Sequence, residues 1–448
     1  MNQPVSIFWF RRDLRLDDNA GLYHALKSGR PVLPLFIFDR NILDDLPKKD
    51  ARVEFIHGAV ADLKKHLEEM GSTLLVRYGK PQEVWPEILK EFEVAAVFTN
   101  RDYEPYALDR DDFVRQLLSG KNIPFHTFKD HVIFEKDEVL KNDGTPYTVF
   151  TPYSRKWLEK LESREMTVVR ENGERETDSF FLTSYPTAKY FSNFLKTKPL
   201  PFPTLGQMGF EPAGISFPSK SVTQGSIKNY DKTRNFPGIP GTSRLSVHFR
   251  FGTISIREKA RLARRLNATY LNELIWRDFY SQILAHFPRV VNRPFQPKYE
   301  RVEWREAPDE FQKWCEGKTG YPIVDAGMRE LNATGYMHNR VRMIAASFLT
   351  KHLLLDWRLG EAYFAEKLLD FDLASNSGGW QWAAGCGTDA APYFRIFNPT
   401  EQAKKFDPEF KYIRKWVPEF GTPAYPPPMV EHTFARERCL ATYKKALL

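Results

Sequence analysis

The chain has 448 residues, 42% of them hydrophobic and 27% charged, so it can bury substantial cores and is predicted to fold as two or three globular domains. Its formal net charge is +8, yet residues 1–130 hold 19 basic and 21 acidic side chains, so the positive excess lies in residues 131–448. Three cysteines without CxxC spacing exclude a disulfide framework and a zinc cluster, and no apolar run is long enough to span a membrane, which predicts a cytoplasmic protein.

Short apolar runs and amphipathic segments alternate along residues 1–130. Strands are predicted at 5–10, 31–39, 72–79, 94–100 and 125–134, and helices at 21–29, 51–71, 84–92 and 107–122. This alternation predicts a Rossmann-like α/β domain with a doubly wound parallel sheet. The GxGxxG motif is missing after the first strand, where the sequence is RRDLRLDDN, so nicotinamide binding is not expected.

Proline, serine, threonine and phenylalanine dominate residues 131–225, which predicts a long interdomain linker with only short elements of secondary structure. The remaining residues, 226–448, are predicted to form an all-helical domain. Its helical periodicity is clearest at 256–267, 271–287, 308–317, 321–335, 338–357 and 360–370. The basic excess of this part indicates either a solvated basic face or a polyanionic partner such as DNA.

Several constellations in the helical part have two interpretations each. Arg342 can pair with Asp370 or Asp372, either as a structural ion pair or as part of a ligand site. Glu273 and Trp276 share one helical face, and spacing alone favours a core tryptophan beside a solvated glutamate. The hydroxyls and arginine of TSRLS suit a phosphate at a helix N-terminus, although helix capping explains two of the hydroxyls equally well. The histidine spacing predicts no metal site.

Taken together, the longest motifs identify a family. The chain resembles the photolyase/cryptochrome flavoproteins, and most closely the class I cyclobutane pyrimidine dimer photolyases. The resemblance covers nearly the whole chain and lies in FWFRRDLRLDDNAGL, YDKTRNFPGIPGTSRLS, LNELIWRDFY, GKTGYPIVDAGMRELNATGYMHNRVRM and DFDLASNSGGWQWAAGCGTDAAPYFRIFNPTEQAKKFD.

The resemblance implies that FAD binds in the helical domain. The positions that match the family's FAD contacts are Tyr230, Thr242, Ser243, Arg244, Leu245, Ser246, Arg342, Asp370, Phe371, Asp372 and Asn376. Asn376 matches the residue that faces flavin N5, where asparagine favours a fully reduced flavin. Trp380, Trp357 and Trp304 match the proximal, middle and exposed members of the family's electron-transfer triad.

The resemblance also implies a DNA-binding surface and a pocket for the damaged bases. The matching positions are Arg234, Glu273, Trp276, Asn339, Arg340, Met343, Trp382 and Gln402. The implied activity is light-driven repair, in which an electron passes from excited FADH⁻ to a cyclobutane pyrimidine dimer and afterwards returns to the flavin. In this reaction Glu273 and Asn376 act beside the three tryptophans, the partner is UV-damaged DNA, and the protein is expected to be monomeric.

Three points remain open within the resemblance. A second, antenna chromophore can be a deazaflavin, a flavin or a folate, and Val291 and Asn292 disfavour folate because folate-binding members carry cysteine and lysine there. A cryptochrome-type photoreceptor is the alternative function from another class. A DASH-type photolyase that prefers single strands is a third reading, supported mainly by Tyr336, which stands where class I members often carry tryptophan.

Overall fold

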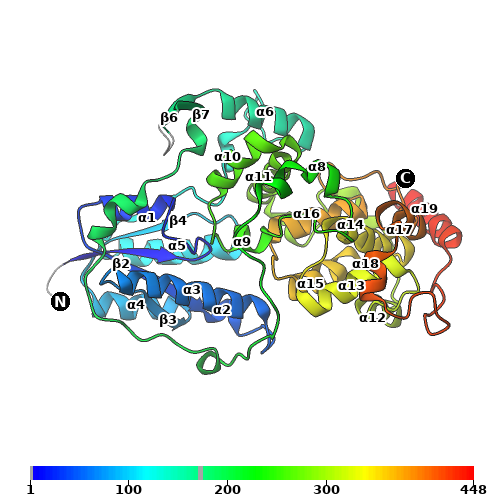
Figure 1. The fold of residues 1–448 in the computed structure, drawn as a ribbon, viewed down its shortest axis with the longest axis horizontal. Coiled ribbons are helices and arrows are strands. Elements are labelled where there is room, and N and C mark those ends of the chain that lie inside the picture. The colour runs from blue at the N-terminus through cyan, green and yellow to red at the C-terminus, as the bar shows by residue number, and fades with distance from the viewer. Residues whose placement is uncertain (1–3, 170–174) are drawn as a thin grey trace. The chain divides into compact units, whose positions relative to one another are not determined.

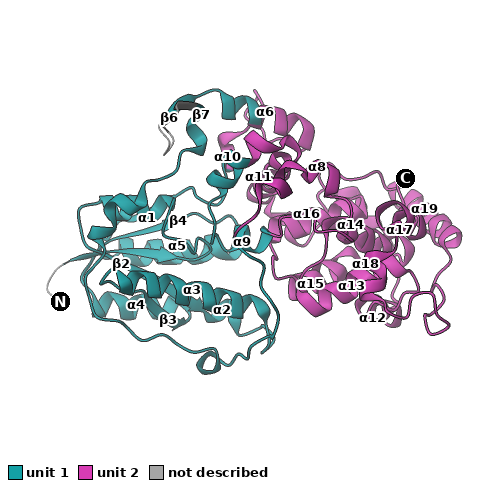
Figure 2. Ribbon diagram, in the orientation of Figure 1, with its two compact units in different colours: residues 1–135, 158–220, 245–262 teal, residues 136–157, 221–244, 263–448 magenta. Residues whose placement is uncertain are grey.

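The computed structural model describes residues 4–169 and 175–448, which form two compact units. Unit 1 comprises residues 1–135, 158–220 and 245–262, and unit 2 comprises residues 136–157, 221–244 and 263–448 (Figure 2). The chain therefore passes between the units several times. The three-part division predicted at residues 130 and 225 stays a prediction.

Unit 1 is built on a five-stranded parallel sheet in the order β3-β2-β1-β4-β5 (Figure 1). Its strands are β1 (Val5–Phe10), β2 (Val32–Asp39), β3 (Leu75–Gly79), β4 (Val94–Asn100) and β5 (Phe125–Phe128). Helices α1 (Ala20–Lys27), α2 (Arg40–Leu43), α3 (Ala51–Glu69), α4 (Pro81–Glu91) and α5 (Pro105–Ser119) connect them. Every residue of β1 and β2 is buried, as expected where helices cover both faces of a sheet. The predicted doubly wound α/β fold is confirmed.

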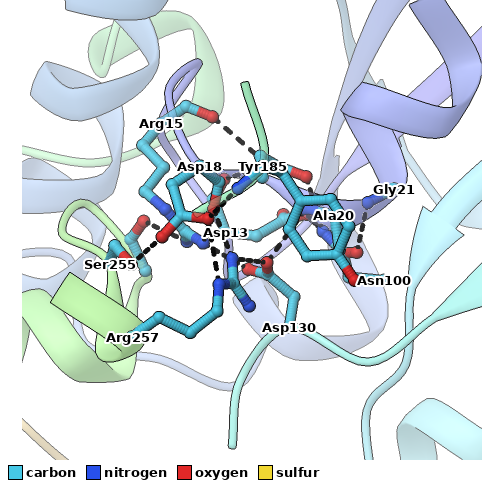
Figure 3. A network of polar contacts seen from close by, with 12 residues as sticks. Asp13, Arg15, Asp18, Ala20, Gly21, Asn100, Asp130, Tyr185, Ser255 and Arg257 are labelled. Atoms are coloured by element: carbon cyan, nitrogen blue, oxygen red, sulfur yellow. Dashed lines mark hydrogen bonds and ion pairs between the residues drawn. The ribbon is translucent and has the colours of Figure 1, made fainter. Parts of the chain in front are cut away.

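The N-terminus of α1, which follows the loop after β1, differs from that of dinucleotide-binding folds, in agreement with the absence of GxGxxG from the sequence. In dinucleotide-binding folds the N-terminus of the first helix holds a pyrophosphate. Here the backbone N–H of Ala20 donates to Asp130 at 3.0 Å, and that of Gly21 donates to Asn100 at 2.8 Å (Figure 3). Because side chains already bind these donors, the end of α1 presents no phosphate site.

Three buried ion pairs extend this network. Asp130 accepts from Arg15 at 2.7 Å and from Arg257 at 2.8 Å, and Arg257 also pairs with Asp18 at 2.9 Å (Figure 3). Asn100 in turn donates to Asp13 at 2.6 Å. The network thus ties the loop after β1 to the ends of β4 and β5 and to the segment around Arg257.

One helix was not expected from the sequence. Helix α6 (Phe150–Glu162) lies in the region predicted to contain only short elements. Phe150, Tyr153 and Trp157 recur at helical spacing and are buried, and the Trp157 indole donates to Asp278 at 3.0 Å. The prolines and serines on either side obscured this apolar stripe. Farther along, strands β6 (Glu165–Val169) and β7 (Arg175–Ser179) pair antiparallel.

Unit 2 is helical, as predicted. Its helices are α7 (Gln224–Lys228), α8 (Tyr230–Thr233), α11 (Ala268–His286), α12 (Pro308–Cys315), α13 (Pro322–Thr334), α14 (Asn339–Ser347), α15 (Trp357–Lys367), α16 (Leu373–Ala384), α17 (Pro399–Phe406), α18 (Lys411–Trp416) and α19 (His432–Leu447). Helices α9 (Ser246–Arg250) and α10 (Ile256–Leu266) precede α11 in the chain. A large core holds unit 2 together and includes Trp314, Trp357, Trp380 and Tyr443. In the described part of the chain, no helix has the length and apolar character needed to cross a bilayer.

Candidate cofactor and substrate site

Helix α16 lies at the centre of the candidate site and packs against α11, α14 and α15 of unit 2. It begins where Asp372 accepts a hydrogen bond from the backbone N–H of Ser375 at 3.1 Å. Its close approach to α11 requires glycine at position 378, because a Cβ there would lie 2.3 Å from the ring of Tyr280. Helix α16 therefore presents its side chains to three neighbouring helices.

A buried ion pair joins α14 to the segment before α16. The guanidinium of Arg342 donates to both carboxylate oxygens of Asp370, at 2.9 and 3.1 Å, and its Nε donates to the carbonyl of Met337 at 2.8 Å. The sequence left Asp370 and Asp372 as alternative partners. The structure selects Asp370, while Asp372 caps α16. Phe371, between them, is half-buried against the core of unit 2.

Asn376 is held by a residue that the sequence analysis missed. Its side-chain amide donates to the carboxylate of Glu361 at 2.8 Å and to the carbonyl of Glu361 at 3.1 Å. Burial raises the pKa of Glu361, while the hydrogen bond from Asn376 acts in the opposite direction. The sequence does contain a signal that could have identified Glu361. Trp357, Gly360, Glu361 and Phe364 recur at helical spacing and form one stripe on α15.

Four guanidinium groups surround His338, which caps α14 by accepting from the backbone N–H of Arg340 at 3.2 Å. Burial, together with four neighbouring positive charges, lowers the pKa of His338 to about 4. The neutral ring thus accepts at Nδ1 and carries its proton on Nε2, which is buried without a partner among the described residues. The charges belong to Arg234, Arg244, Arg340 and Arg342.

The TSRLS segment divides between the units. In unit 2, the hydroxyl of Thr242 lies 3.3 Å from that of Tyr336, and Ser243 accepts from Tyr270 at 3.0 Å. Arg244 has a left-handed backbone (φ 52°), and its guanidinium lies 4.4 Å from the ring centroid of Tyr336. Tyr230 is half-buried, with its ring 5.0 Å from that of Tyr270. Leu245 and Ser246 belong to unit 1, where Ser246 begins α9.

Glu273 and Trp276 share a face of α11, and both are half-buried. Glu273 pairs with Arg234 at 2.6 Å; burial raises its pKa, and Arg234 lowers it. The ring of Trp276 stacks on Phe150 with centroids 3.6 Å apart and planes 5° apart. Spacing alone favoured a core tryptophan beside a solvated glutamate, whereas in the structure Trp276 is only half-buried and Glu273, also half-buried, is paired with Arg234.

The other predicted DNA- and substrate-contacting residues lie on α14, α16 and α17. Asn339 is exposed at the first position of α14. Arg340 donates to Asn235 at 2.7 Å and has Met343 and Phe406 as further neighbours. Trp382 on α16 and Gln402 on α17 are half-buried.

Of the three tryptophans that match the triad, Trp380 and Trp357 belong to the core of unit 2 and Trp304 packs against that core. Trp380 and Trp357 are each 2% exposed, whereas Trp304 is half-buried with its ring 6.1 Å from that of Tyr443. A Cβ at Gly360 would lie 2.0 Å from the Trp380 ring, so glycine there lets the indole lie against α15. Within the part of the chain that the structure describes, the aromatic ring neighbours of Trp380 are Phe364 and Trp314. Trp314 was not singled out from the sequence.

The donor set fits FAD. Arg340 is hydrogen-bonded to a neutral amide, and Arg244 approaches Glu330 only to 3.9 Å, so positive charge near His338 is incompletely balanced by carboxylates. A pyrophosphate supplies negative charge, and the buried Nε2–H of His338 is a donor suited to a ligand acceptor. Hydroxyls at Thr242 and Ser243 add the neutral groups that phosphate and ribityl oxygens require.

The sequence of this chain is similar to those of known proteins over nearly its whole length. Residues 270–422 match the family model described as the FAD binding domain of DNA photolyase, and residues 6–171 match the model described as DNA photolyase. The chain is 39% identical over 479 residues to the deoxyribodipyrimidine photo-lyase of Escherichia coli (98% of each chain) and 37% identical over 495 residues to that of Halobacterium salinarum (99% of each).

Solved structures agree with the sequence comparison. A bacterial class III photolyase from Agrobacterium tumefaciens is similar with a TM-score of 0.84 and 32% identity, over 100% of this chain and 98% of the other. An archaeal photolyase from Sulfolobus tokodaii with two FAD molecules is similar with a TM-score of 0.79 and 31% identity, over 98% and 100%. A Synechocystis cryptochrome has a TM-score of 0.82 at 26% identity, over 99% and 100%.

Proposed function

The chain belongs to the DNA photolyase family, and from that membership we infer that it is a deoxyribodipyrimidine photo-lyase, which repairs cyclobutane pyrimidine dimers in DNA under light. The observation that carries this function is the single arrangement in unit 2 of the Arg342–Asp370 pair, Asn376 held by Glu361, and the arginines around His338. Each of these features serves an anionic, redox-active cofactor.

Bound FAD supplies a light-absorbing group that donates one electron to the dimer and receives it back. We propose that Arg342 and Asp370 hold the cofactor beside the ring system, and that Asn376 faces the flavin with its amide oriented by Glu361. The hydroxyls of Thr242 and Ser243, with Arg244, would bind the phosphate side. Because the chemistry is the cofactor's, these residues position it and exclude water.

The DNA is UV-damaged in this proposal. A dimer pairs poorly with the opposite strand, so its extrusion from the helix costs less than the extrusion of normal bases. Phe150 covers one face of Trp276 and leaves the indole as a rigid wall, on which a base recovers about 1–3 kcal/mol by stacking. Arg340 would bind the phosphate backbone, and Glu273 would accept a hydrogen bond from a thymine edge.

We further propose that the protein acts in a reducing compartment, which its three buried, free cysteines support, and that it acts as a monomer, as the resemblance implies. A second chromophore is supported by the two FAD molecules of the Sulfolobus tokodaii relative. Heating the protein releases its bound chromophores, and chromatography of the released material identifies the second chromophore. A flavin or deazaflavin is the expected result.

The deciding test is repair itself. The purified protein is chemically reduced and mixed with an oligonucleotide that contains one cyclobutane thymine dimer, and the ultraviolet absorbance of thymine is followed under blue light and in the dark. Recovery in the light alone supports the proposed function. Absence of recovery, although FAD is bound and can be reduced, overturns it in favour of a photoreceptor.

Replacing Glu273 with glutamine is expected to lower the rate of repair by about 10–100-fold, because a charge-assisted hydrogen bond is worth roughly 1.5–3 kcal/mol. The exposed Glu303, which pairs with Lys445, provides the control Glu303→Gln, which should repair like the wild type. FAD content is measured for both variants. Equal repair rates in Glu273→Gln and the control contradict the role of Glu273.

Replacing Glu361 with alanine is expected to speed the air oxidation of the reduced flavin, since Asn376 loses the partner that orients its amide. Glu361→Gln keeps an acceptor for the same amide and should behave nearly like the wild type. The decay of the reduced-flavin absorbance after mixing with oxygenated buffer reports the difference. Identical decay in the alanine and glutamine variants would show that Glu361 does not act through Asn376.

A further inference from the structure

Helix α6 receives its N-terminal cap from a distant part of the chain. The residue before it is Val149, whose side chain has no atom that accepts a hydrogen bond. The backbone N–H of Phe150 donates instead to Oδ2 of Asp389 at 3.1 Å, across 239 positions of sequence. Beside this contact, the hydroxyl of Thr388 donates to the carbonyl of Thr148 at 2.5 Å. Two adjacent side chains from the segment after α16 therefore bind the start of α6.

The backbone of Asp389 adopts a strained conformation at this contact. Its φ is 47°, in the left-handed region that only glycine adopts without cost and that asparagine and aspartate tolerate best among the other residues. Such a conformation persists where the surrounding structure fixes it, and positions of this kind cluster at functional sites. Glycine would satisfy the backbone alone, so the carboxylate of Asp389 is the part of the residue that needs an explanation.

Phe150 connects this cap to the candidate substrate site. Its ring is 6% exposed and stacks on the indole of Trp276, with centroids 3.6 Å apart and planes 5° apart. Phe279 on α11 contacts both rings, at 5.7 Å from Phe150 and 5.6 Å from Trp276. Trp276 itself is half-buried, so part of its side chain is open to a ligand. The position of Phe150 thus helps to fix the plane of the indole.

We propose that Asp389 is a positioning residue for lesion binding, which acts through Phe150 to hold the indole of Trp276 in the orientation that stacks on a damaged base. This inference rests on the function proposed above, in which Trp276 is the aromatic wall for the dimer. An indole that is already fixed needs no further ordering when the lesion binds. Without the carboxylate of Asp389, Phe150 loses its fixed position and Trp276 gains rotamers that binding must remove.

The rest of α6 is anchored independently of this cap. Tyr153 and Trp157, the next members of its apolar stripe, are buried, and the indole of Trp157 donates to Asp278 at 3.0 Å. Loss of the cap is therefore expected to free the first turn and leave the remaining helix in place. Because the first turn carries Phe150, the effect falls on the ring stack with Trp276 rather than on the fold.

Single and double variants separate positioning from a general loss of stability. Asp389→Ala removes the acceptor, Asp389→Asn keeps an acceptor and tolerates the left-handed backbone, and Phe150→Leu removes the ring. Glu431→Ala is the matched control, because the exposed Glu431 caps α19 by accepting from the backbone N–H of Phe434 at 2.7 Å. The dissociation constant for an oligonucleotide with one thymine dimer is measured in the dark, and the repair rate at saturating DNA in the light. FAD absorbance and circular dichroism confirm that each variant binds FAD and is folded.

Asp389→Ala is expected to raise the dissociation constant by about three- to tenfold, the cost of ordering one side chain on binding, while Asp389→Asn binds nearly like the wild type. The repair rate at saturating DNA should change by less than about twofold, because the bound lesion meets the same indole. Phe150→Leu should raise the dissociation constant at least as much, and Asp389→Ala/Phe150→Leu no further, since both changes act through one ring. Additive losses in the double variant overturn the proposal, as does an equal loss in Glu431→Ala.

A measurement without DNA keeps this inference separable from the proposed function. The tryptophans are replaced by fluorotryptophan, and the fluorine resonance of residue 276 is assigned with Trp276→Phe. In the FAD-bound protein, Asp389→Ala should shift or broaden that resonance, whereas Glu431→Ala should leave it unchanged. An unaltered resonance in Asp389→Ala overturns the positioning role even in a protein that repairs dimers. A shifted resonance in a protein that binds no dimer shows that Asp389 positions Trp276 while the repair function fails.

Discussion

Replacing Asp130 with asparagine is expected to lower the free energy of unfolding by about 3–5 kcal/mol, because it removes the carboxylate that two buried guanidiniums share and leaves Arg257 with Asp18 alone. The Asp130 side chain is fully buried and accepts from Arg15 at 2.7 Å, from Arg257 at 2.8 Å and from the backbone of Ala20 at 3.0 Å. Asparagine keeps the shape but removes the charge. Urea unfolding measures the effect, as a lower midpoint of the transition assigned to unit 1.

The control and the pH dependence identify the cause. Asp112→Asn removes an exposed carboxylate that pairs with Arg115, and it should change stability by less than about 0.5 kcal/mol. Burial alone would raise the pKa of Asp130, but Arg15 and Arg257 outweigh it and hold the pKa below its usual range.

The sign of the pH dependence follows from that depressed pKa. The contribution of Asp130 is complete above the pKa of an unfolded aspartate, about 3.9, and is lost as the pH falls through the lower folded value. The difference between wild type and Asp130→Asn should therefore shrink below a pH of about 4. A difference that stays constant there would contradict the ion-pair explanation.

Replacing Arg342 with glutamine is expected to weaken FAD binding by a factor on the order of 100 or more, corresponding to roughly 2–5 kcal/mol for a broken buried pair. Asp370, whose side chain is 7% exposed, would keep its negative charge without a partner and would face an anionic cofactor. The affinity is measured by titrating the cofactor-free protein with FAD and following flavin fluorescence.

A double variant separates folding from binding. In Arg342→Gln/Asp370→Asn both charges are absent, so the free energy of unfolding should recover part of its loss while FAD affinity stays low. Arg358→Gln, which removes a half-exposed guanidinium paired with Asp356, should bind FAD like the wild type. Wild-type FAD affinity in Arg342→Gln would mean that the pair is purely structural.

Local sequence patterns were sufficient for much of the fold. The alternation of apolar and amphipathic segments in residues 5–130 predicted the parallel sheet, and helical periodicity predicted α11 and α13 close to their observed bounds, whereas the helix predicted at 338–357 ends as α14 at Ser347. Helix α6 was missed because its apolar stripe of Phe150, Tyr153 and Trp157 lies within a region rich in prolines and serines. Its place depends on contacts such as that between Trp157 and Asp278, which no local pattern contains.

The candidate site shows the same division. Motifs with their own internal spacing pointed to Asn376, Trp380 and Arg342, but the groups that act on these residues come from other helices. Glu361 reaches Asn376 across the contact between α15 and α16, and Asp370 rather than Asp372 meets Arg342 because Asp372 caps α16. The choice between equivalent partners is made by helix packing.

By itself the sequence determined the class of fold, the absence of a nicotinamide-type phosphate loop and the family, since each depends on residue order and periodicity along the chain. Only the tertiary structure decided which side chains meet. It brought Trp314 to Trp380 from 66 positions away and stacked Phe150 on Trp276. It also gathered arginines from three segments around His338. Contacts of this kind depend on how helices with similar apolar stripes pack, and that geometry is a property of the whole core.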